Sequence, residues 1–371
     1  MSKFISKNYY IKNPLIVRAQ LYEWQRRSIS NLIDLIVRKV RDQNVEKVKR
    51  SVKNLYQGVL IDMLNGGDLK IGTSMIVRII AAKINVRSLE VQRCLAYPYD
   101  YRPSTSFNKK LHVQYEPNKL QVEHEPNRFT EIVLPSARLD EILSYNLSDQ
   151  ELIELVERYA FLMPELGFFW SIHPDAYLKS SQIDQRYTHK VIEGFASPLN
   201  HNLDNWCSVY SQDIKLGSMG TFQDVIRSEI TPENKSIRWI INPAYTEYII
   251  DVAHREIIDR MARYPEDEFL LLLPGWPHLP IVEWLINNNS ICWYMEGGAY
   301  RVFDHITNED VNVPVGVNMI IGYVRSSKAT LPLPSFIEDM VTASTLAGAN
   351  PKPIIITKDD IRTNNVSNIK L

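Results

Sequence analysis

The sequence predicts an α/β protein, a three-layer sandwich of helices on a sheet, preceded by a small helical domain. From residue 148 onward, apolar runs of strand length alternate with helical stretches, which is typical of a sheet covered by helices on both faces. Before residue 98, apolar residues recur at spacings of three and four, as they do along one face of a helix. With 371 residues, the chain has room for about two domains and a sizeable core.

Residues 1–97 are predicted to form a basic helical domain. Residues 1–100 carry 18 Lys and Arg against 8 Asp and Glu, a balance of +10, whereas the rest of the chain has a balance of −11. This asymmetry indicates contact with a polyanion at one end of the protein, although a solvated helix face rich in Lys and Arg would give the same pattern. The basic residues that crowd the polar positions of the longest helical run are Arg38, Lys39, Arg41, Lys47, Lys49 and Arg50.

Residues 98–147 are predicted to be a linker or a long irregular excursion, because they combine prolines and polar residues with few apolar periods. Tyr97, Tyr99 and Tyr101 alternate with other residues at its start. Such tyrosines can stack on nucleic-acid bases or pack an extended linker onto a domain, and both interpretations stay open. Residues 346–371 are predicted to be a C-terminal tail.

Residues 148–345 form the predicted main domain. Ser148 followed by Glu151 is typical of a capping box that opens a helix. The continuous apolar run at 269–273 is typical of a strand that is covered on both faces. The predicted strands are residues 191–196, 237–241, 269–273, 291–295 and 319–324, and the predicted helices between them are residues 246–263 and 279–288.

Several classes of protein are excluded by composition. Cys94, Cys207 and Cys292 are far apart and odd in number, so neither a disulfide framework nor a metal site is predicted. A reducing, intracellular compartment is expected, either the cytoplasm or the nucleus. The N-terminus has no signal-peptide core, and no apolar run approaches the roughly 20 residues of a membrane span, so no membrane contact is expected.

The predicted strand at 237–241 ends in Asn242-Pro243-Ala244-Tyr245, at the carboxyl end of the sheet, where open α/β sheets bind their ligands. An Asn oxygen and a neighbouring backbone carbonyl can accept the two hydrogens of an exocyclic amine, while the aromatic ring stacks on a flat base. Asn-Pro is also a common start of a turn, so the tetrapeptide by itself permits a plain strand-to-helix turn.

A second strand tip precedes it by 49 residues, counted from Glu193 to Asn242. That separation suits two strands whose tips open on one cleft. Glu193 can hold ribose hydroxyls or an amino group, and Ser197 and Asn200 can bind a carboxylate. The tip lacks the GxGxxG pattern, so dinucleotide binding is not supported. The glycines of residues 216–220 permit either a close ligand approach or a turn.

These stretches resemble the phosphorylated-CTD-interacting-factor family, the cap-specific mRNA adenosine N6-methyltransferases. The family's Glu-x-Phe-Ala-Ser-Pro-Leu-Asn stands here at residues 193–200, its Phe-Gly-Ser-x-Gly loop at 216–220 and its Asn-Pro-Pro-Phe at 242–245. Leu-Pro-Gly-Trp at 273–276 is similar to the family's Ile-Pro-Glu-Trp. The resemblance covers about residues 150–327.

The resemblance implies a Rossmann-like class I methyltransferase fold and methyl transfer from S-adenosylmethionine to adenosine N6 in RNA, at or near the mRNA cap. It implies an adenine site at Asn242, Pro243 and Tyr245. Trp276 lies at a predicted strand tip, where it can face the substrate or form part of the core or cleft wall. The capped 5′ end of the RNA would be held by the basic N-terminal domain, and no metal is required. The residues implied in cofactor binding are Glu193, Phe195, Ala196, Ser197, Asn200, Gly217, Ser218 and Gly220.

Three of the departures from the family pattern bear on the proposed chemistry. Ala244 replaces the second proline and adds an N–H donor, Tyr245 replaces Phe, and Met219 stands where the family often has a basic residue. Two alternatives therefore remain. The chain can be a catalytically inactive methyltransferase-like subunit that binds RNA or a protein partner as a scaffold, or an adenine N6-methyltransferase that acts on DNA.

Overall fold

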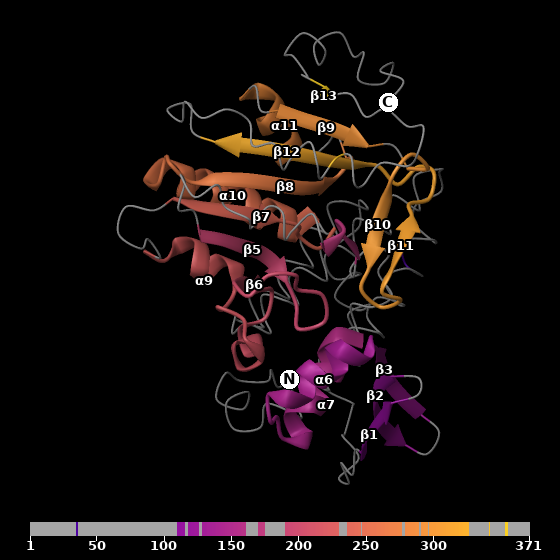
Figure 1. Ribbon diagram of the computed structural model, residues 1–371. Coiled ribbons are helices and arrows are strands. Elements are labelled where there is room, and N and C mark those ends of the chain that lie inside the picture. The colour runs from indigo at the N-terminus through magenta and orange to yellow at the C-terminus, as the bar shows by residue number, and fades with distance from the viewer. Residues whose placement is uncertain are drawn as a thin grey trace. The chain divides into compact units, whose positions relative to one another are not determined.

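The structure is a computed structural model, and its chain divides into two compact units. The predicted basic domain at residues 1–97, including its six basic candidate residues, lies outside the described residues except for Leu35. The predicted tail at 346–371 likewise lies outside them except for residues 353–354. The structure describes residues 110–115, 118–125, 128–160, 170–174, 190–229, 236–245, 247–276, 279–288, 291–295, 297–325 and 353–354, together with Leu35 and Val341 (Figure 1).

The first unit contains a three-stranded antiparallel sheet where a linker or irregular excursion was predicted. Its strands, in the order β1-β2-β3, are β1 (Lys110–Tyr115), β2 (Asn118–Glu125) and β3 (Arg128–Val133). Leu120, Val122 and Ile132 are fully buried on one face of this sheet. The prediction was wrong because it overlooked an alternation that the sequence contains, with Leu111 and Val113 on β1 and Leu120 and Val122 on β2. Pro117 and Pro126, which stand between these short strands, favoured the interpretation as a linker.

The helix α7 (Asp149–Ala160) packs on β3 and groups with this first unit. Its start is as predicted: the backbone N–H of Ser148 donates to Glu151 Oε2 at 2.9 Å, and the N–H of Glu151 lies 3.4 Å from Ser148 Oγ. The predicted main domain at 148–345 thus begins with a helix that belongs to the other unit, because its buried residues Leu155 and Tyr159 complete the core of the small sheet. The boundary between the units runs through the preceding helix, α6 (Ser136–Ser144).

The second unit is built on a mixed seven-stranded sheet with the order β13-β9-β12-β8-β7-β5-β6 (Figure 1). β6, β5, β7 and β8 run parallel, whereas β12 lies antiparallel between β8 and β9. The α/β class and all five predicted strands are confirmed. The strands are β5 (Lys190–Ala196), β6 (Trp206–Ser208), β7 (Ile237–Ile241), β8 (Glu268–Pro274), β9 (Ile291–Met295), β12 (Met319–Arg325) and β13 (Pro353–Ile354).

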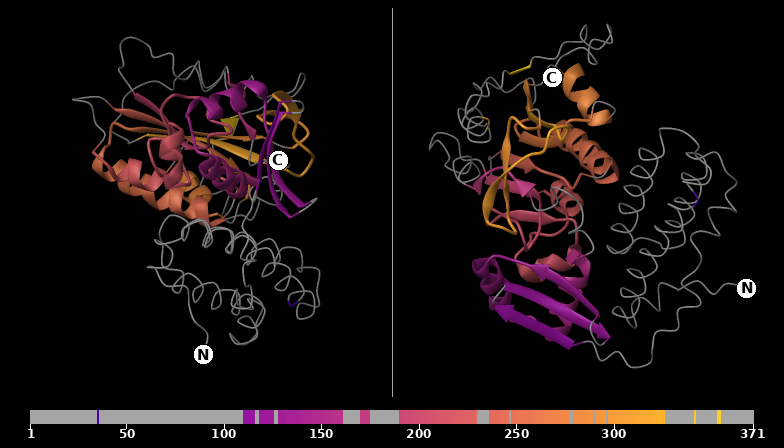
Figure 2. Two further views of the ribbon diagram at one scale, coloured as in Figure 1. Left: turned by 90° about the horizontal axis from the view of Figure 1, so that it is seen from below. Right: turned by 90° about the vertical axis from the view of Figure 1, so that its right-hand side faces the viewer.

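Three helices cover one face of this sheet. Phe222 of α9 meets the Trp239 ring of β7 at 6.1 Å, and the Arg260 guanidinium of α10 lies over the same ring at 5.6 Å. Leu285 of α11 packs so closely on β12 that a Cβ at Gly322 would lie 3.1 Å from it. Figure 2 shows α10 and α11 together on one side of the sheet. These helices are α9 (Phe222–Arg227), α10 (Glu247–Arg263) and α11 (Pro280–Asn287), and the last two confirm the predicted helices.

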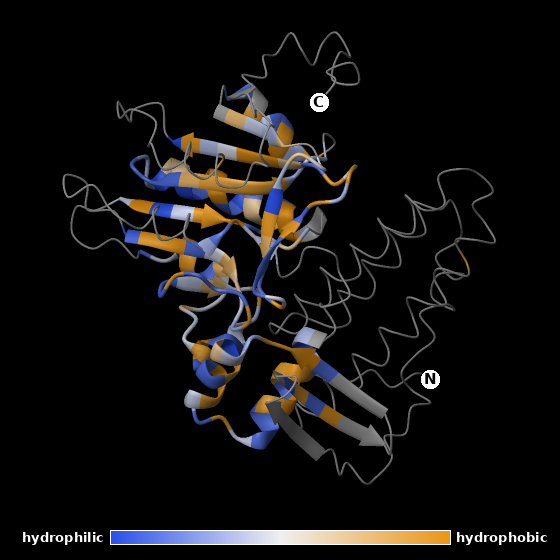
Figure 3. Ribbon diagram, turned by 45° about the vertical axis from the view of Figure 1, so that its right-hand side comes forward, coloured by the Kyte–Doolittle hydropathy of each residue, from blue (hydrophilic) through white to orange (hydrophobic). Residues whose placement is uncertain are grey.

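The opposite face packs against a second, smaller sheet with the order β11-β10-β4. Its strands are β4 (Trp170–Ser171), β10 (Arg301–Asp304) and β11 (Glu309–Asn312). Ile172, Tyr300 and Val302, on or next to this sheet, join Ile240 and Leu270 of the large sheet in one buried cluster. Hydrophobic residues dominate the strands at the centre of the large sheet (Figure 3), because those strands are covered on both faces.

Candidate functional site

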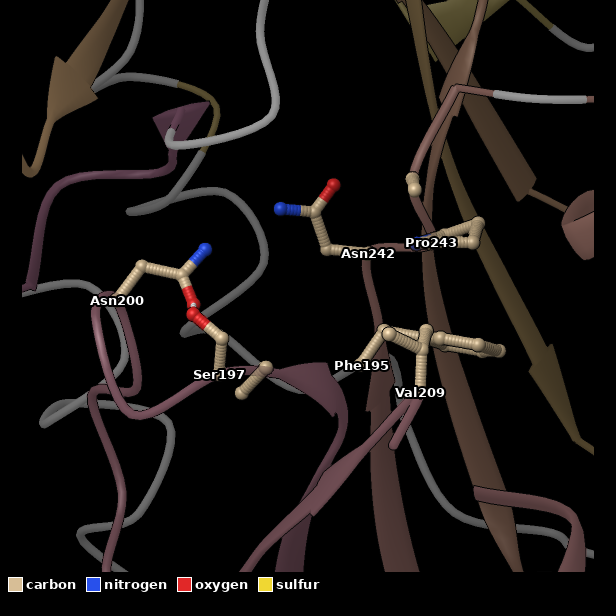
Figure 4. Close-up of a pocket in the computed structure, with 8 residues that line it drawn as sticks. Phe195, Ser197, Asn200, Val209, Asn242 and Pro243 are labelled. Atoms are coloured by element: carbon tan, nitrogen blue, oxygen red, sulfur yellow. Dashed lines mark hydrogen bonds between the residues drawn. The ribbon is translucent and has the colours of Figure 1, made fainter. Parts of the chain in front are cut away.

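A pocket opens at the carboxyl ends of β5 and β7, two neighbouring parallel strands, and the segments that follow these strands line it. It comprises about 370 Å³ of empty space, its open mouth included. The structure thus brings together the two strand tips that the sequence places on one cleft (Figure 4). The residues that line it are Phe195, Ala196, Ser197 and Asn200 after β5, Val209 after β6, and Asn242, Pro243 and Ala244 after β7.

The β5 tip is folded into a compact turn by its own side chains. Ser197 Oγ donates to Asn200 Oδ1 at 2.7 Å and accepts from the N–H of Leu199 at 3.2 Å. Ser and Asn stabilise turns in this way because their short polar side chains reach nearby backbone groups. The carboxamide oxygen of Asn200 is committed to Ser197, so its nitrogen points to the side of the pocket where Asn242 lies (Figure 4).

Glu193 lies inside the protein instead of lining this pocket, and only 2% of it is exposed. Its Oε2 accepts hydrogen bonds from the N–H groups of Asn202 at 2.8 Å and Leu203 at 3.3 Å. The carboxylate therefore fixes the loop that follows the pocket-lining turn. The structure does not bring Glu193 together with the other predicted cofactor residues, and its contact with a cofactor stays a prediction.

The glycine loop that was predicted to contact the cofactor runs beside β6. Gly217 has a φ of 90° and Gly220 a φ of 130°, which a residue with a Cβ adopts only with strain. The N–H of Met219 donates to Trp206 O at 2.8 Å, and Ser218 Oγ lies 3.0 Å from Gly220 O. Gly217, Ser218 and Gly220 are not among the described residues that line the pocket, so the glycines here form a tight turn back to the sheet.

The β7 tip presents its polar side chain to the pocket. Asn242 is partly buried, and its Nδ2 donates to the backbone carbonyl of Trp170 in β4 at 3.2 Å. A carbonyl oxygen can only accept, so the NH₂ end of the carboxamide must face Trp170. The side-chain oxygen of Asn242 is therefore turned away from β4 and available as an acceptor.

Two aromatic residues stand side by side at the tips of β7 and β8. The rings of Tyr245 and Trp276 meet edge to face, with centroids 6.4 Å apart. Burial raises the pKa of the Tyr245 hydroxyl. The hydroxyl of Tyr300 donates a hydrogen bond to Val317 O at 3.0 Å. Tyr245 as a whole is partly buried, and the structure pairs this predicted stacking residue with the predicted substrate residue Trp276.

Two features of this site escaped the sequence reasoning. Val209 lines the pocket from the end of β6, a three-residue strand too short to show a period. Trp170 contacts Asn242 through its backbone carbonyl, which no side-chain pattern reveals. Among the described residues, no cluster of His, Cys, Asp and Glu could hold a metal ion. Within the same residues, no helix is long and apolar enough to span a membrane.

Fold and site together define a mixed α/β protein with a pocket at the carboxyl edge of its large sheet. The model of the family described as phosphorylated CTD interacting factor 1 WW domain matches residues 147–291. This segment contains the four parallel strands and both pocket tips, and its match supports the resemblance to the phosphorylated-CTD-interacting-factor family. The resemblance seen in the sequence is confirmed. A comparison with curated proteins gave no match.

Proposed function

We propose that the chain transfers a methyl group from S-adenosylmethionine to the N6 of adenosine in RNA, at or near the mRNA cap. The observation that carries this proposal is the single pocket shared by the motif residues of β5 and β7. The family match supports the mRNA context. The sheet order supports a Rossmann-like class I methyltransferase sandwich, because its one antiparallel strand within the core, β12, is inserted between β8 and β9.

The pocket lining fits the cofactor. Phe195 and Val209 supply apolar surface, and the Ser197–Asn200 turn supplies polar groups at the rim. When bound, S-adenosylmethionine supplies a sulfonium methyl group, whose C–S bond breaks as the new N–C bond forms.

The role of the β7 tip is to prepare the amine. The lone pair of adenine N6 is delocalised into the ring, so the nitrogen is a poor nucleophile. The Asn242 oxygen and the Pro243 carbonyl would accept its two hydrogens and aim the lone pair out of the ring plane. N6 loses one proton to water after the bond forms, so no strong base is required. Tyr245 and Trp276 would form the aromatic wall for the base.

The test is calorimetry of S-adenosylmethionine binding, followed by methyl transfer to capped RNA that begins with adenosine. We expect binding by the wild-type protein and transfer that Asn242→Ala abolishes. Uncapped RNA and single-stranded DNA of the same sequence serve as comparison substrates. Transfer to DNA in preference to both RNAs would move the assignment to a DNA adenine N6-methyltransferase.

The second candidate is an inactive methyltransferase-like subunit that acts as an RNA- or protein-binding scaffold. One feature that favours it is Ala244 in the pocket wall, where the family has proline. Another is Glu193, whose carboxylate accepts hydrogen bonds from the N–H groups of Asn202 and Leu203. The family description, with its phosphorylated CTD interacting factor, supports a protein partner. Cofactor binding without transfer to any of the three substrates would select this candidate. Transfer restored by Ala244→Pro would then identify Ala244 as the cause.

A further inference from the structure

The contact between Asn242 and β4 bears directly on how the candidate site works. A carboxamide side chain has a donor end and an acceptor end of similar shape, and rotation by half a turn exchanges them. Only the acceptor end can take a hydrogen from an amine. The Trp170 carbonyl, 3.2 Å from Nδ2, selects one of the two orientations because it repels the oxygen end.

The position of that carbonyl is set in turn by Asp304. β4 pairs antiparallel with β10, with Trp170 opposite Asp304. The indole Nε1–H of Trp170 donates to Asp304 Oδ2 at 3.3 Å. The other carboxylate oxygen, Oδ1, accepts from the N–H of Ile306 at 2.8 Å and closes the turn after β10. One carboxylate therefore joins the β10 turn to the residue that faces Asn242.

The neighbouring pair holds the same two strands in register. Ser171 Oγ lies 2.8 Å from His305 Nε2 and donates to Ile172 O at 2.7 Å. Ser171 and His305 are both buried. Because β4 is only two residues long, its two side chains, Trp170 and Ser171, supply much of what fixes it on β10.

We propose that Asp304 and Trp170 are positioning residues that orient the Asn242 carboxamide so that its oxygen faces the amine substrate. This inference rests on the proposed methyl transfer. It also gives a reason for an amide at position 242. A carboxylate there would set an oxygen against the Trp170 carbonyl and be pushed out of place.

The test is Asp304→Asn, with Asp310→Asn as the matched control. An Asn at 304 keeps an acceptor for the turn, where Asn and Asp serve equally well, but it sets an NH₂ group against the Trp170 indole N–H. Asp310 lies on the same hairpin and pairs with Arg301 at 3.1 Å. Its substitution removes a carboxylate from β11 without touching Trp170.

We expect Asp304→Asn to lower kcat roughly 10- to 100-fold, the scale of a misplaced catalytic contact. KM for RNA and Kd for S-adenosylmethionine should stay within about twofold, because the pocket lining is unchanged. Asp310→Asn should behave like the wild type. Trp170→Phe, which removes only the indole N–H donor and keeps a ring, should lower kcat in the same direction.

A second readout does not depend on activity. In protein labelled with ¹⁵N at asparagine, the Asn242 side-chain NH₂ signal is assigned by its loss in Asn242→Ser. We expect this signal to shift in Asp304→Asn and to stay in place in Asp310→Asn. Unchanged kcat together with an unchanged signal would overturn the inference. A shifted signal in a protein whose wild type transfers no methyl group would keep the orienting role and reject the proposed function.

Discussion

The two strands whose ends form the pocket, β5 and β7, use the polar residues of their motifs in opposite ways. At the β7 tip, Asn242 reaches the pocket, with one end of its carboxamide held by Trp170 and the other available. In the middle of β5, Glu193 is turned into the protein, and its carboxylate accepts hydrogen bonds from the N–H groups of Asn202 and Leu203. Both residues stand in stretches that resemble the same family. Asn242 presents its side-chain oxygen to the pocket, whereas Glu193 fixes the conformation of a loop. The hydrogen-bond partners of each side chain determine whether it faces the pocket or holds the loop.

The largest expected effect comes from removing the Asn242 carboxamide. Asn242→Ala should lower methyl transfer on the order of 100-fold or more, because a preorganised acceptor at the reacting amine is lost. The melting temperature should change little, since one partly exposed hydrogen bond contributes about 1 kcal/mol. Single-turnover kinetics and thermal unfolding measure the two effects.

Asn288→Ala is the matched control for this change. The Asn288 side chain also donates to a tryptophan carbonyl, Trp284 O, at 2.8 Å, but on the exposed end of α11. We expect the control to lose a similar small amount of stability and to keep full activity. Equal activity in both variants would show that the β7 tip is structural.

The next effect in size tests the inward role of Glu193. Glu193→Ala should destabilise the protein by about 1–3 kcal/mol, because it leaves the partly buried N–H of Asn202 and the buried N–H of Leu203 without their acceptor. Cofactor affinity should fall with it, since the same loop carries the pocket-lining Asn200. Denaturant unfolding and calorimetry are the measurements.

Glu193→Gln separates the two possible roles of that carboxylate. The amide retains one acceptor oxygen for the Asn202 N–H, so a residue that acts only on its loop should recover most of the stability and most of the cofactor affinity. If stability returns while the Kd for S-adenosylmethionine remains as weak as in Glu193→Ala, Glu193 touches the cofactor itself. The predicted cofactor contact would then hold.

Ser197→Ala should have a smaller effect. The change removes the hydrogen bond to Asn200 Oδ1 and the acceptor for the Leu199 N–H, at a cost of about 1 kcal/mol. It frees the Asn200 carboxamide to rotate, so we expect a several-fold rise in the Kd for S-adenosylmethionine with kcat nearly unchanged. A large fall in kcat would instead place Ser197 at the reacting atoms.

Much of the large sheet could be predicted from the sequence, because strands covered on both faces are continuously apolar. The predicted runs at 237–241 and 291–295 coincide with β7 and β9, and the Ser148–Glu151 pair opens α7 as predicted. β10 and β11 were not predicted from the sequence, because β11 is mostly exposed and shows no apolar alternation. The sheet of β1 to β3 was not predicted because its apolar alternation runs over short strands that are separated by Pro117 and Pro126, and prolines with polar neighbours are also typical of a linker.

The sequence predicts which residues form the site, but not how their side chains are oriented. The sequence places Ser197, Asn200 and Asn242 at strand ends, and the structure brings them to one pocket. The groups that orient the polar side chains are backbone atoms, such as the Trp170 carbonyl, 72 residues from Asn242 in the chain. Every residue has a carbonyl and nearly every residue an N–H, so sequence alone does not reveal which of them faces a given side chain.

The smallest expected effect concerns Tyr245, the residue beside the β7 tip. Burial raises the pKa of its hydroxyl, so the group is neutral near neutral pH and does not serve as a base. Tyr245→Phe restores the family residue and keeps the ring against Trp276. Activity should therefore stay within about twofold at neutral pH, with a stability change of about 1 kcal/mol or less. A loss of activity like that of Asn242→Ala would mean that the hydroxyl contacts the substrate.

The pH dependence of the same variant sharpens the comparison. A folded-state pKa raised above the unfolded value of about 10 means that the folded protein favours the neutral phenol. The corresponding stability is present below that value and is lost as the pH rises above it. We expect thermal unfolding of the wild type to show a steeper alkaline loss of stability than that of Tyr245→Phe. Identical profiles would show that the hydroxyl reaches solvent, which would make Tyr245, like Asn242, a group presented to the pocket.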